Sequence, residues 1–201
     1  MSPLILAFDT SAAHCAAAVL SGDKVLQSAE EPMAKGQAER LLGLCQDLIT
    51  QAGFNVSDLN AIGVGIGPGN FTGIRISVSA ARGLALGLGI KAVGVSAFDA
   101  LQLGQTGPCA CTVDGRREQV FFKSYGQMVP TDPALEHLTA LPPFSGPMIG
   151  HGGDAPLYPV AEAIARITAT RFTTEVARPA PLYLRPADAA PARDAAPAVL
   201  T

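Results

Sequence analysis

The chain has 201 residues, of which 48% are hydrophobic and 21 are glycines, and its formal net charge is −3 at pH 7. This composition predicts a soluble globular protein with one large or two small hydrophobic cores. An acidic chain lacks the basic surface by which proteins hold nucleic acid unaided, so any function on RNA would need a partner that grips the RNA.

The cysteines and the N-terminus both indicate a cytoplasmic protein. Four cysteines are scattered along the chain without the spacing of a zinc site or a C-x-x-C pair, which fits reduced thiols. The first eight residues are apolar but lack a basic segment and run directly into Asp9, so they do not resemble a signal peptide. No stretch is apolar over the length needed to span a bilayer.

Three short apolar runs open the chain and predict three strands joined by two tight turns. They lie at residues 4–8, 14–20 and 24–29. The first turn contains Asp9, Thr10 and Ser11, whose carboxylate and hydroxyls can face a phosphate or its magnesium ion. The same residue types are common in turns because they hydrogen-bond their own backbone, so both interpretations stay open.

Residues 37–52 follow with a clear helical pattern. Apolar side chains recur there at spacings of three and four, and Gly53 ends the run. The apolar positions are Ala38, Leu41, Leu42, Cys45, Leu48, Ile49 and Ala52. We expect this helix to bury one face, because each large side chain so buried stabilises the fold by roughly 1.5–3 kcal/mol.

Residues 61–66 predict a buried strand with two unlike faces. Ile62, Val64 and Ile66 alternate with glycines, so one face carries branched side chains and the other is bare backbone. Another part of the molecule must therefore lie close over the bare face.

The turn that follows, Gly67-Pro68-Gly69-Asn70, leads directly into a second helix. Asn70 or Thr72 can cap this helix with a side-chain oxygen. The free N–H groups at the start of the helix would suit an anion.

The predicted helix at 72–88 is apolar on almost all sides, and its two charges, Arg75 and Arg82, share one face. Small residues form a row at spacing four, namely Gly73, Ser77, Ala81, Ala85 and Gly89. The large residues expected to face the sheet are Ile74, Val78 and Leu86. Part of the small row would then let another helix approach closely, and that neighbour is either part of this chain or a second protein.

The rest of the chain contains shorter elements. A strand at 91–95 and a helix opened by Ser96 complete a β-β-β-α-β-α-β-α order, which predicts a mixed sheet with helices on its faces. Beyond it we expect hairpin strands at 109–114 and 119–125, a weak helix at 132–141, a strand at 148–150, a helix at 155–168 and a mobile or extended tail past Arg185.

The three histidines do not form a site in the sequence. His14, His137 and His151 lie on different predicted elements without an obvious carboxylate partner, so we expect no metal centre. Ser11 and His14 could be a nucleophile and its base, but we expect strand geometry to separate them.

Five sequence blocks, taken in order, carry a resemblance to a known family. They are LILAFDTS at 4–11, GPGNFTGIRI at 67–76, ARGLA at 81–85, VDGRR at 113–117 and PLYLR at 181–185. These blocks resemble the TsaB family, also called YeaZ, which comprises glycoprotease-like (peptidase M22-like) non-catalytic paralogues of TsaD. The resemblance spans nearly the whole chain.

The resemblance implies an α/β fold of the actin/Hsp70 type (ASKHA, with a ribonuclease H-like motif) in two subdomains, the second reduced. Residues 1–100 would form the N-terminal subdomain with the partner-docking helices. Residues 101–186 would form the C-terminal subdomain, and residues 187–201 an Ala/Pro-rich tail.

The resemblance also implies a non-catalytic subunit. Such proteins bind the catalytic subunit TsaD and, with the ATPase TsaE, support transfer of threonylcarbamoyl to N6 of adenosine 37 in tRNAs that read ANN codons. A homodimer is expected when the partner is absent, and tRNA is expected to bind only through the complex. No cofactor of its own is implied, and ATP or ADP would bind at the interface with the partner.

Two groups of site residues follow from these interpretations, and none is catalytic or metal-binding. The residues expected near a nucleotide or phosphate are Asp9, Thr10, Ser11, Gly67, Gly69, Asn70, Thr72 and Asp114. The residues expected at the partner interface are Leu41, Leu44, Cys45, Leu48, Gly73, Arg75, Ser77, Ala81, Arg82 and Ala85.

Two departures from the family pattern bear on the alternatives. Gln37 stands where family members commonly carry a histidine, and the metal-binding histidine pair of the catalytic paralogues is absent. Both departures count against a glycoprotease-type peptidase. The other alternative is a small-molecule kinase of the same fold, with Asp9 and Asp114 at the phosphates and the segment 152–154 at the nucleotide, and the short second half counts against it.

Overall fold

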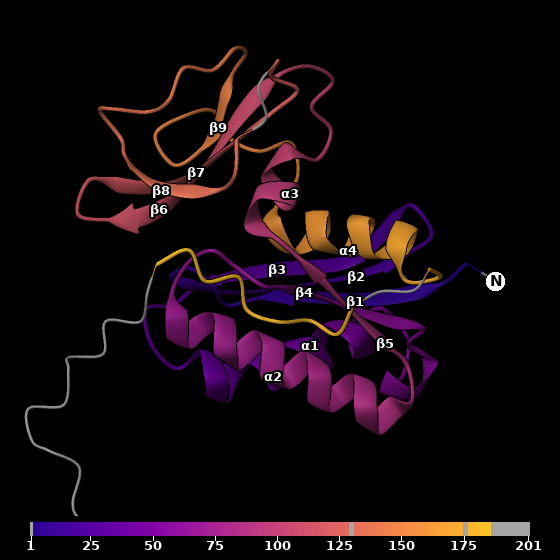
Figure 1. The fold of residues 1–201 in the computed structure, drawn as a ribbon. Helices are drawn as coiled ribbons and strands as arrows, with labels where there is room; N and C mark the ends of the chain where they lie inside the picture. The colour runs from indigo at the N-terminus through magenta and orange to yellow at the C-terminus, as the bar shows by residue number, and fades with distance from the viewer. Residues whose placement is uncertain (1, 129–130, 175–176, 186–201) are drawn as a thin grey trace, which may run out of the picture.

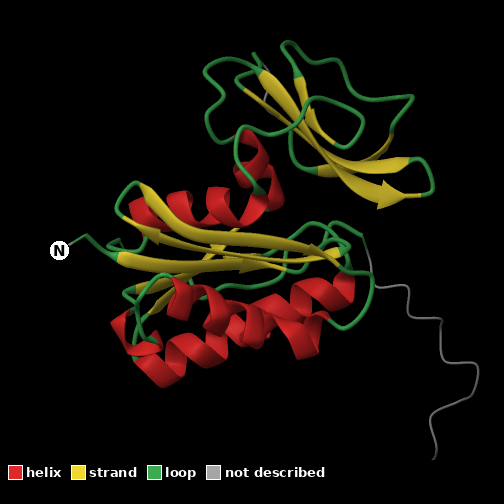
Figure 2. Cartoon of the chain, turned by 180° about the vertical axis from the view of Figure 1, so that it is seen from behind, coloured by secondary structure: helices red, strands yellow, loops and turns green. Residues whose placement is uncertain are grey.

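Figure 1 shows the computed structural model, which describes residues 2–128, 131–174 and 177–185. A five-stranded sheet lies between two layers of helices, and a four-stranded sheet lies beyond one of those layers. Figure 2 shows the same order of layers from behind. The predicted α/β class is confirmed.

The first sheet is built from the N-terminal half of the chain. Its strands are β1 (Leu4–Asp9), β2 (His14–Ser21), β3 (Lys24–Pro32), β4 (Ala61–Gly65) and β5 (Lys91–Val95), in the order β3-β2-β1-β4-β5. Tight turns join β1, β2 and β3, which are antiparallel, whereas helical crossovers bring β4 and β5 in parallel to β1. The predicted element order is confirmed, with one added 3-10 turn, η1 (Val56–Asp58).

Helices cover both faces of this sheet, as Figure 1 shows. On one face lie α1 (Gln37–Gln51) and α2 (Phe71–Leu88), and on the other lies α4 (Val160–Arg171). The two faces follow from the strand period, because Leu6 and Ile62 belong to the core under α1 and α2, whereas Ile5 belongs to the core under α4. The bare strand face is covered as expected, since a Cβ at Gly63 would overlap the Thr168 side chain of α4.

Helix α2 has a side-chain cap at its N-terminus, and both α1 and α2 are followed by a glycine in the left-handed conformation. The Asn70 side chain accepts a hydrogen bond from the Gly73 N–H at 3.0 Å, and Gly89 ends α2 in the left-handed conformation at φ 67°. After Ala52, Gly53 takes the left-handed conformation beyond the end of α1. Both helices agree with the predicted bounds to within a residue.

The second sheet is smaller. Its strands are β6 (Cys109–Arg116), β7 (Gln119–Tyr125), β8 (Ala134–His137) and β9 (Met148–Gly150), in the order β8-β7-β6-β9. The predicted hairpin and the strand at 148–150 are confirmed. The weak helix predicted at 132–141 is wrong, because this segment instead pairs with β7 and Leu135 packs against the small core of the second sheet.

Two helices connect the sheets. The Ser96 side chain caps α3 (Ala97–Gln102) by accepting from the Asp99 N–H at 3.0 Å. Helix α4 begins at Val160 rather than at 155, because Pro159 stands at its N-cap and proline cannot lie inside a helix without breaking it. Helix α4 packs on the first sheet, although it follows the second sheet in the chain.

The last described residues, 177–185, run from the first sheet to the second. The Leu182 N–H donates to the Ile66 carbonyl at 2.8 Å, and Arg185 Nη2 donates to the Gly115 carbonyl of β6 at 3.0 Å. Figure 1 shows this segment in yellow beside α2. The predicted tail, residues 187–201, lies outside the described residues.

Candidate functional site

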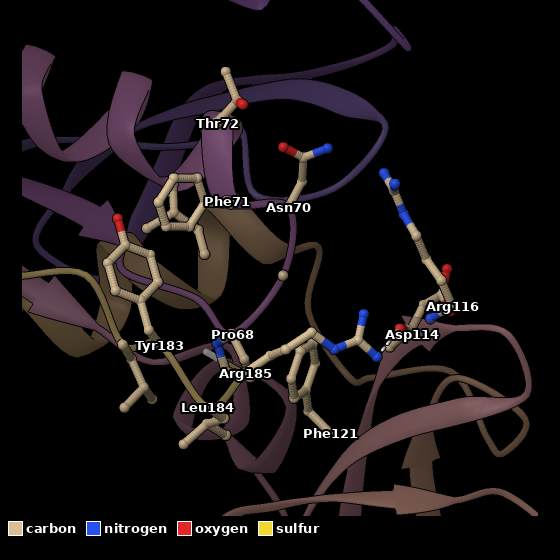
Figure 3. Close-up of a pocket in the computed structure, with 14 residues that line it drawn as sticks. Pro68, Asn70, Phe71, Thr72, Asp114, Arg116, Phe121, Tyr183, Leu184 and Arg185 are labelled. Carbon is tan, nitrogen blue, oxygen red and sulfur yellow. Dashed lines mark hydrogen bonds between the residues drawn. The ribbon is translucent and has the colours of Figure 1, made fainter. Parts of the chain in front are cut away.

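A cavity of about 620 Å³ lies where the first turn of α2, the β6–β7 hairpin and the segment 182–185 meet (Figure 3). Of the predicted phosphate-proximal residues, the cavity is lined by Gly69, Asn70, Thr72 and Asp114. Other lining residues were not among those predicted for a site, including Phe71, Arg116, Tyr183 and Arg185. All four lie inside the blocks that carry the family resemblance, and that placement was the signal that could have found them.

The turn Asp9-Thr10-Ser11 does not line this cavity. Its residues are 2%, 0% and 7% exposed. Asp9 Oδ1 accepts from the N–H and the hydroxyl of Ser11, both at 2.9 Å, and the Thr10 hydroxyl donates to the Gly73 carbonyl at 2.7 Å. These bonds connect β1 to the first turn of α2, and the expected position of this turn near a phosphate stays a prediction.

Gly67 does not line the cavity either. It is held in the left-handed region at φ 91°, and a Cβ there would come within 3.3 Å of the Leu182 carbonyl oxygen and would overlap the side chain of Ile74. Its role is to let the chain pass closely between α2 and the C-terminal segment.

His14 has the carboxylate partner that the sequence did not reveal. Its Nε2 lies 2.7 Å from Asp9 Oδ1 and its Nδ1 lies 3.4 Å from Glu30 Oε1. Burial lowers the pKa of His14, but the hydrogen bonds and charges of the two carboxylates outweigh burial and hold it above its usual value. Ser11 and His14 are thus not separated as expected, yet each bonds the Asp9 carboxylate rather than the other, which is not a nucleophile–base arrangement.

An aromatic and cationic cluster stands at the mouth of the cavity. The rings of Phe71 and Tyr183 stack with centroids 4.7 Å apart, and the Arg75 guanidinium lies 4.0 Å from the Phe71 centroid. Arg75 Nε also donates to the Tyr183 hydroxyl at 3.0 Å. Figure 3 shows the two rings side by side next to the turn that carries Asn70. The cluster joins α2 to the C-terminal segment.

The opposite wall is the turn between β6 and β7. Arg116, Arg117 and Glu118 have φ values of 62°, 53° and 62°, a left-handed conformation that costs energy in residues other than glycine. Asp114 Oδ1 supports the turn by accepting from the Arg116 N–H at 2.8 Å. The turn directs the Arg116 side chain to the cavity, where it faces the first turn of α2.

Most residues predicted at the partner interface are buried inside the chain. On α1 these are Leu41, Leu44, Cys45 and Leu48, and on α2 they are Gly73, Ser77, Ala81 and Ala85. The row of small residues faces the protein's own interior, because the Ser77 hydroxyl bonds the Gly65 carbonyl of β4 at 3.2 Å and Ala81 has no exposed surface. The expectation that this row meets a partner is corrected, and only Arg75 and Arg82 of the predicted set are exposed.

The outward face of α2 carries a different set of side chains. Leu86, expected to face the sheet, is 79% exposed, and Leu42 on the outward face of α1 is 52% exposed. Ser79, Gly83 and Gly87 form a second row at spacing four, and a Cβ added at either glycine would meet nothing within 4 Å. This outward face can therefore admit a neighbouring helix at close range.

All four cysteines are buried, and burial raises the pKa of Cys15 to about 11 and that of Cys45 to about 12. Among the described residues there is no group of three His, Cys, Asp or Glu side chains that could hold a metal ion. Within the same residues, no helix is both long and apolar enough to cross a membrane.

Comparison with known proteins identifies the relatives of this architecture. The family model described as "TsaD: tRNA N6-adenosine threonylcarbamoyltransferase" matches residues 30–140. The TsaB protein of Escherichia coli is 34% identical over 126 residues, and the match covers 60% of this chain and 54% of that protein. The TsaB protein of Buchnera aphidicola (Schizaphis graminum) is 40% identical over 50% of this chain and 48% of its own length. The chain thus spans about half the length of these relatives.

A solved structure extends the likeness to nearly the whole chain. A Pseudomonas aeruginosa protein, described as having similarity to peptidase YEAZ, superposes with a TM-score of 0.75 at 26% identity, covering 91% of this chain and 100% of that one. An uncharacterized protein of Mycobacterium bovis is 30% identical over 93% of this chain and 94% of that protein.

Two unequal sheets with a cavity between the second helix and the second sheet define an α/β protein of the actin-like (ASKHA) class. The family model covers more than half of the chain, and the Escherichia coli and Buchnera aphidicola relatives are both named TsaB. The chain belongs to the TsaB (YeaZ) family.

Proposed function

We propose that this protein is a non-catalytic subunit of the machinery that makes N6-threonylcarbamoyladenosine in tRNA. Its partners would be a TsaD-type catalytic subunit and a TsaE-type ATPase, acting on adenosine 37 of tRNAs that read ANN codons. The curated relatives are named tRNA threonylcarbamoyladenosine biosynthesis proteins, and that name supports the pathway. We expect a homodimer when the partner is absent.

The observation that carries the proposal is the outward face of α1 and α2. Two helices lie side by side on one face of the sheet, and their outward surfaces combine exposed leucines with a row of residues that have no side-chain bulk. Leu42 of α1 and Leu86 of α2 are large apolar side chains left exposed on this side, and the small residues beside them on α2 would let a neighbouring helix approach. A standard interface buries roughly 1,600 Å² in total, which two helices from each side can supply.

The internal use of Asp9, Thr10 and Ser11 supports a non-catalytic role for the chain alone. Asp9 Oδ1 accepts from Ser11 and lies at hydrogen-bond distance from His14 Nε2, and the Thr10 hydroxyl donates to the Gly73 carbonyl, so these groups are engaged within the chain. We expect the isolated protein to hydrolyse neither ATP nor peptides above background. Robust turnover that Asp9→Ala abolishes would contradict this part of the proposal.

ATP or ADP, where it binds, would occupy the cavity at the first turn of α2 together with the partner. An anion there would meet the N-terminal end of an 18-residue helix and the Arg116 side chain across the cavity. We expect weak binding by the isolated chain and tighter binding in the complex, as measured by calorimetry. Tight ATP binding by the chain alone would count against a joint site.

The docking proposal is tested by adding bulk to the outward row without disturbing the fold. Gly83→Leu and Gly87→Leu introduce side chains into open space on the proposed contact surface, so folding should survive while a neighbouring helix is pushed away. We expect about tenfold or greater loss of affinity for the TsaD-type subunit of the same organism, which is roughly 1.4 kcal/mol.

The matched control is Gly107→Leu, because a Cβ at Gly107 also meets nothing within 4 Å but lies in the loop before β6. This variant should bind the partner as the unaltered chain does. Unchanged affinity in Gly83→Leu and Gly87→Leu, with melting temperatures equal to that of the unaltered protein, would show that the outward face of α2 is not the docking surface.

A further inference from the structure

A second hollow, of about 490 Å³, lies at the C-terminal end of α2, opposite the end that borders the first cavity. Three separate segments form its walls: the last two turns of α2, the beginning of β5, and residues 178–179. Each segment contributes one exposed cation, Arg82, Lys91 and Arg178 respectively. Among the residues that the structure describes, no carboxylate lines the hollow.

The protein's own described groups do not account for these three cations. Among the described residues, none of the three forms an ion pair, and Lys91 makes one hydrogen bond, from Nζ to the Thr174 carbonyl at 2.7 Å. The last turn of α2 holds no basic residue, so compensation of the helix dipole is not the reason for the cluster. The positive charge is concentrated here although the chain as a whole has a net charge of −3.

The lining between the cations is apolar and, as far as the described residues show, contains no aromatic ring. Ala85, Ile90, Ala92 and Pro179 line the hollow together with Leu86, whose side chain is largely exposed. Single-stranded RNA is usually held by aromatic side chains on which bases stack, and this surface offers none. A protein segment that places carboxylates beside an apolar side chain matches both the charge and the apolar lining.

We propose that this hollow is a docking site for an acidic segment of a protein partner, with carboxylates on Arg82, Lys91 and Arg178 and one apolar side chain against Leu86. The proposal rests on the proposed function only in that the partner is a protein. The contact lies at the C-terminal end of α2. It differs from the row formed by Ser79, Gly83 and Gly87 and from the cavity at the first turn of α2.

The test uses the full isolated chain and a defined probe. The peptide acetyl-Glu-Leu-Glu-Glu-amide is titrated into ¹⁵N-labelled protein, with acetyl-Gln-Leu-Gln-Gln-amide as the uncharged comparison. We expect the acidic peptide to shift the amides of residues 86–92, with affinity that falls as salt shortens the Debye length from about 10 Å at 0.1 M to about 3 Å at 1 M. The glutamine peptide should bind several-fold more weakly.

Charge reversal at the hollow gives the decisive comparison. The double variant Arg82→Glu/Arg178→Glu should lose most of the peptide-induced shifts, whereas Lys24→Glu/Lys35→Glu, which changes net charge equally at exposed lysines elsewhere, should keep them. Three results would overturn the proposal. The two peptides could bind equally, the shifts could fall outside residues 82–92 and 178, or a short uridine oligonucleotide could bind more tightly at the same amides. Because no TsaD-type subunit is present, failure here is independent of the docking test at Gly83 and Gly87.

Discussion

His14 lies between two carboxylates, and its geometry selects the charged imidazole. Both ring nitrogens face carboxylate oxygens, Nε2 toward Asp9 and Nδ1 toward Glu30, and only the protonated ring can donate from both. Because the pKa of His14 in the folded protein lies above its usual value near 6.5, the protonated form stabilises the fold. This contribution is fully present below the unfolded-state pKa and is lost as pH rises through the folded-state pKa.

The first prediction concerns the pH dependence that His14 gives to the free energy of unfolding. Replacing His14→Gln should lower the free energy of unfolding more at about pH 5.5 than at about pH 8.5, because the ion pairs exist only at the lower pH. Urea unfolding at the two pH values measures this difference. Glu30→Gln, in a half-exposed side chain, should reduce the pH dependence without removing it, because Asp9 remains. An equal loss at both pH values for His14→Gln would show that His14 acts only by packing.

The second prediction concerns the contact between Asp9 and β4. A Cβ at Gly65 would overlap the Asp9 carboxylate, so Gly65→Ala must displace the side chain that holds Ser11 and His14. We expect a loss of about 1–3 kcal/mol in the free energy of unfolding, as for other overpacked sites. Gly107→Ala, in open space, is the control and should change stability little. A Gly65→Ala protein as stable as the control would contradict this packing.

Single residues also show how far sequence alone could predict the site. Asn70 could be predicted as one of two candidate caps, beside Thr72, because a side-chain oxygen and a place before an apolar helix are local properties, and the structure selects Asn70. Whether the Asp9 carboxylate faces solvent or His14 is not local, because it depends on the pairing of β1 with β2 and on the position of β3 beside them. Tyr183 reaches Phe71 and Arg75 from more than a hundred residues away, which no sequence spacing reveals.

At the scale of elements, α2 shows why a pattern of small residues is ambiguous. Two rows at spacing four run along this helix, one through Ser77 and Ala81 and one through Ser79 and Gly83. Both rows are equally visible in the sequence. The sheet decides between them, because Ser77 bonds β4 while Gly83 meets nothing within 4 Å. The existence of the helix was predictable from local pattern, but its rotation about its own axis was not.

The third prediction uses these two rows as a matched pair. Ala81→Leu adds bulk in the core between α2 and the sheet and should destabilise the isolated chain by about 1–3 kcal/mol. Gly83 lies on the outward face of α2, where a Cβ meets nothing within 4 Å. Gly83→Ala should therefore stabilise the chain by about 0.8–1.0 kcal/mol, because alanine is a better helix former than glycine. Thermal melting of both variants measures the difference. A stable Ala81→Leu protein would mean that the small row is not internal.

For strand β8 and helix α4, local sequence patterns likewise did not predict the element type or its start. The segment 132–141 contains alanines and leucines that favour a helix, but its backbone is used to extend the second sheet beside β7. The start of α4 was misplaced by five residues, although Pro156 and Pro159 were visible signals that delay a helix.

At the scale of the whole molecule, connections between distant segments set how the two sheets are joined. Helix α4 follows the second sheet in the chain but packs on the first. Nη1 of Arg171, the last residue of α4, lies 3.4 Å from Oδ2 of Asp99 in α3. Tyr125 of β7 donates to the same Asp99 carboxylate at 3.0 Å. Such ties depend on tertiary packing, which is why the sequence could predict two sheets but not the elements that join them.

The segment 177–185 forms the other tie between the sheets, and Arg185 is its contact with the second one. Arg185 Nη2 donates to the Gly115 carbonyl at 3.0 Å and to the Gln119 side chain at 2.6 Å, while Leu182 holds the segment to Ile66 of the first sheet. The β6–β7 hairpin therefore bonds to a segment that is itself anchored on the other side of the cavity (Figure 3). Hydrogen bonds from a charged donor typically contribute about 1.5–3 kcal/mol.

The last prediction is that Arg185→Ala loosens the hairpin more than it loosens the first sheet. We expect a loss of about 1.5 kcal/mol in the free energy of unfolding and faster hydrogen exchange at the amides of residues 115–121, with little change in β1. Arg117→Ala is the matched control, because Arg117 stands on the same turn, and its side chain has no hydrogen bond among the described residues. Native-state hydrogen exchange of the three proteins separates local opening from global destabilisation. Equal protection of residues 115–121 in the two variants would mean that the second sheet is held by α3 and α4 alone, and the cavity would then keep its shape without the C-terminal segment.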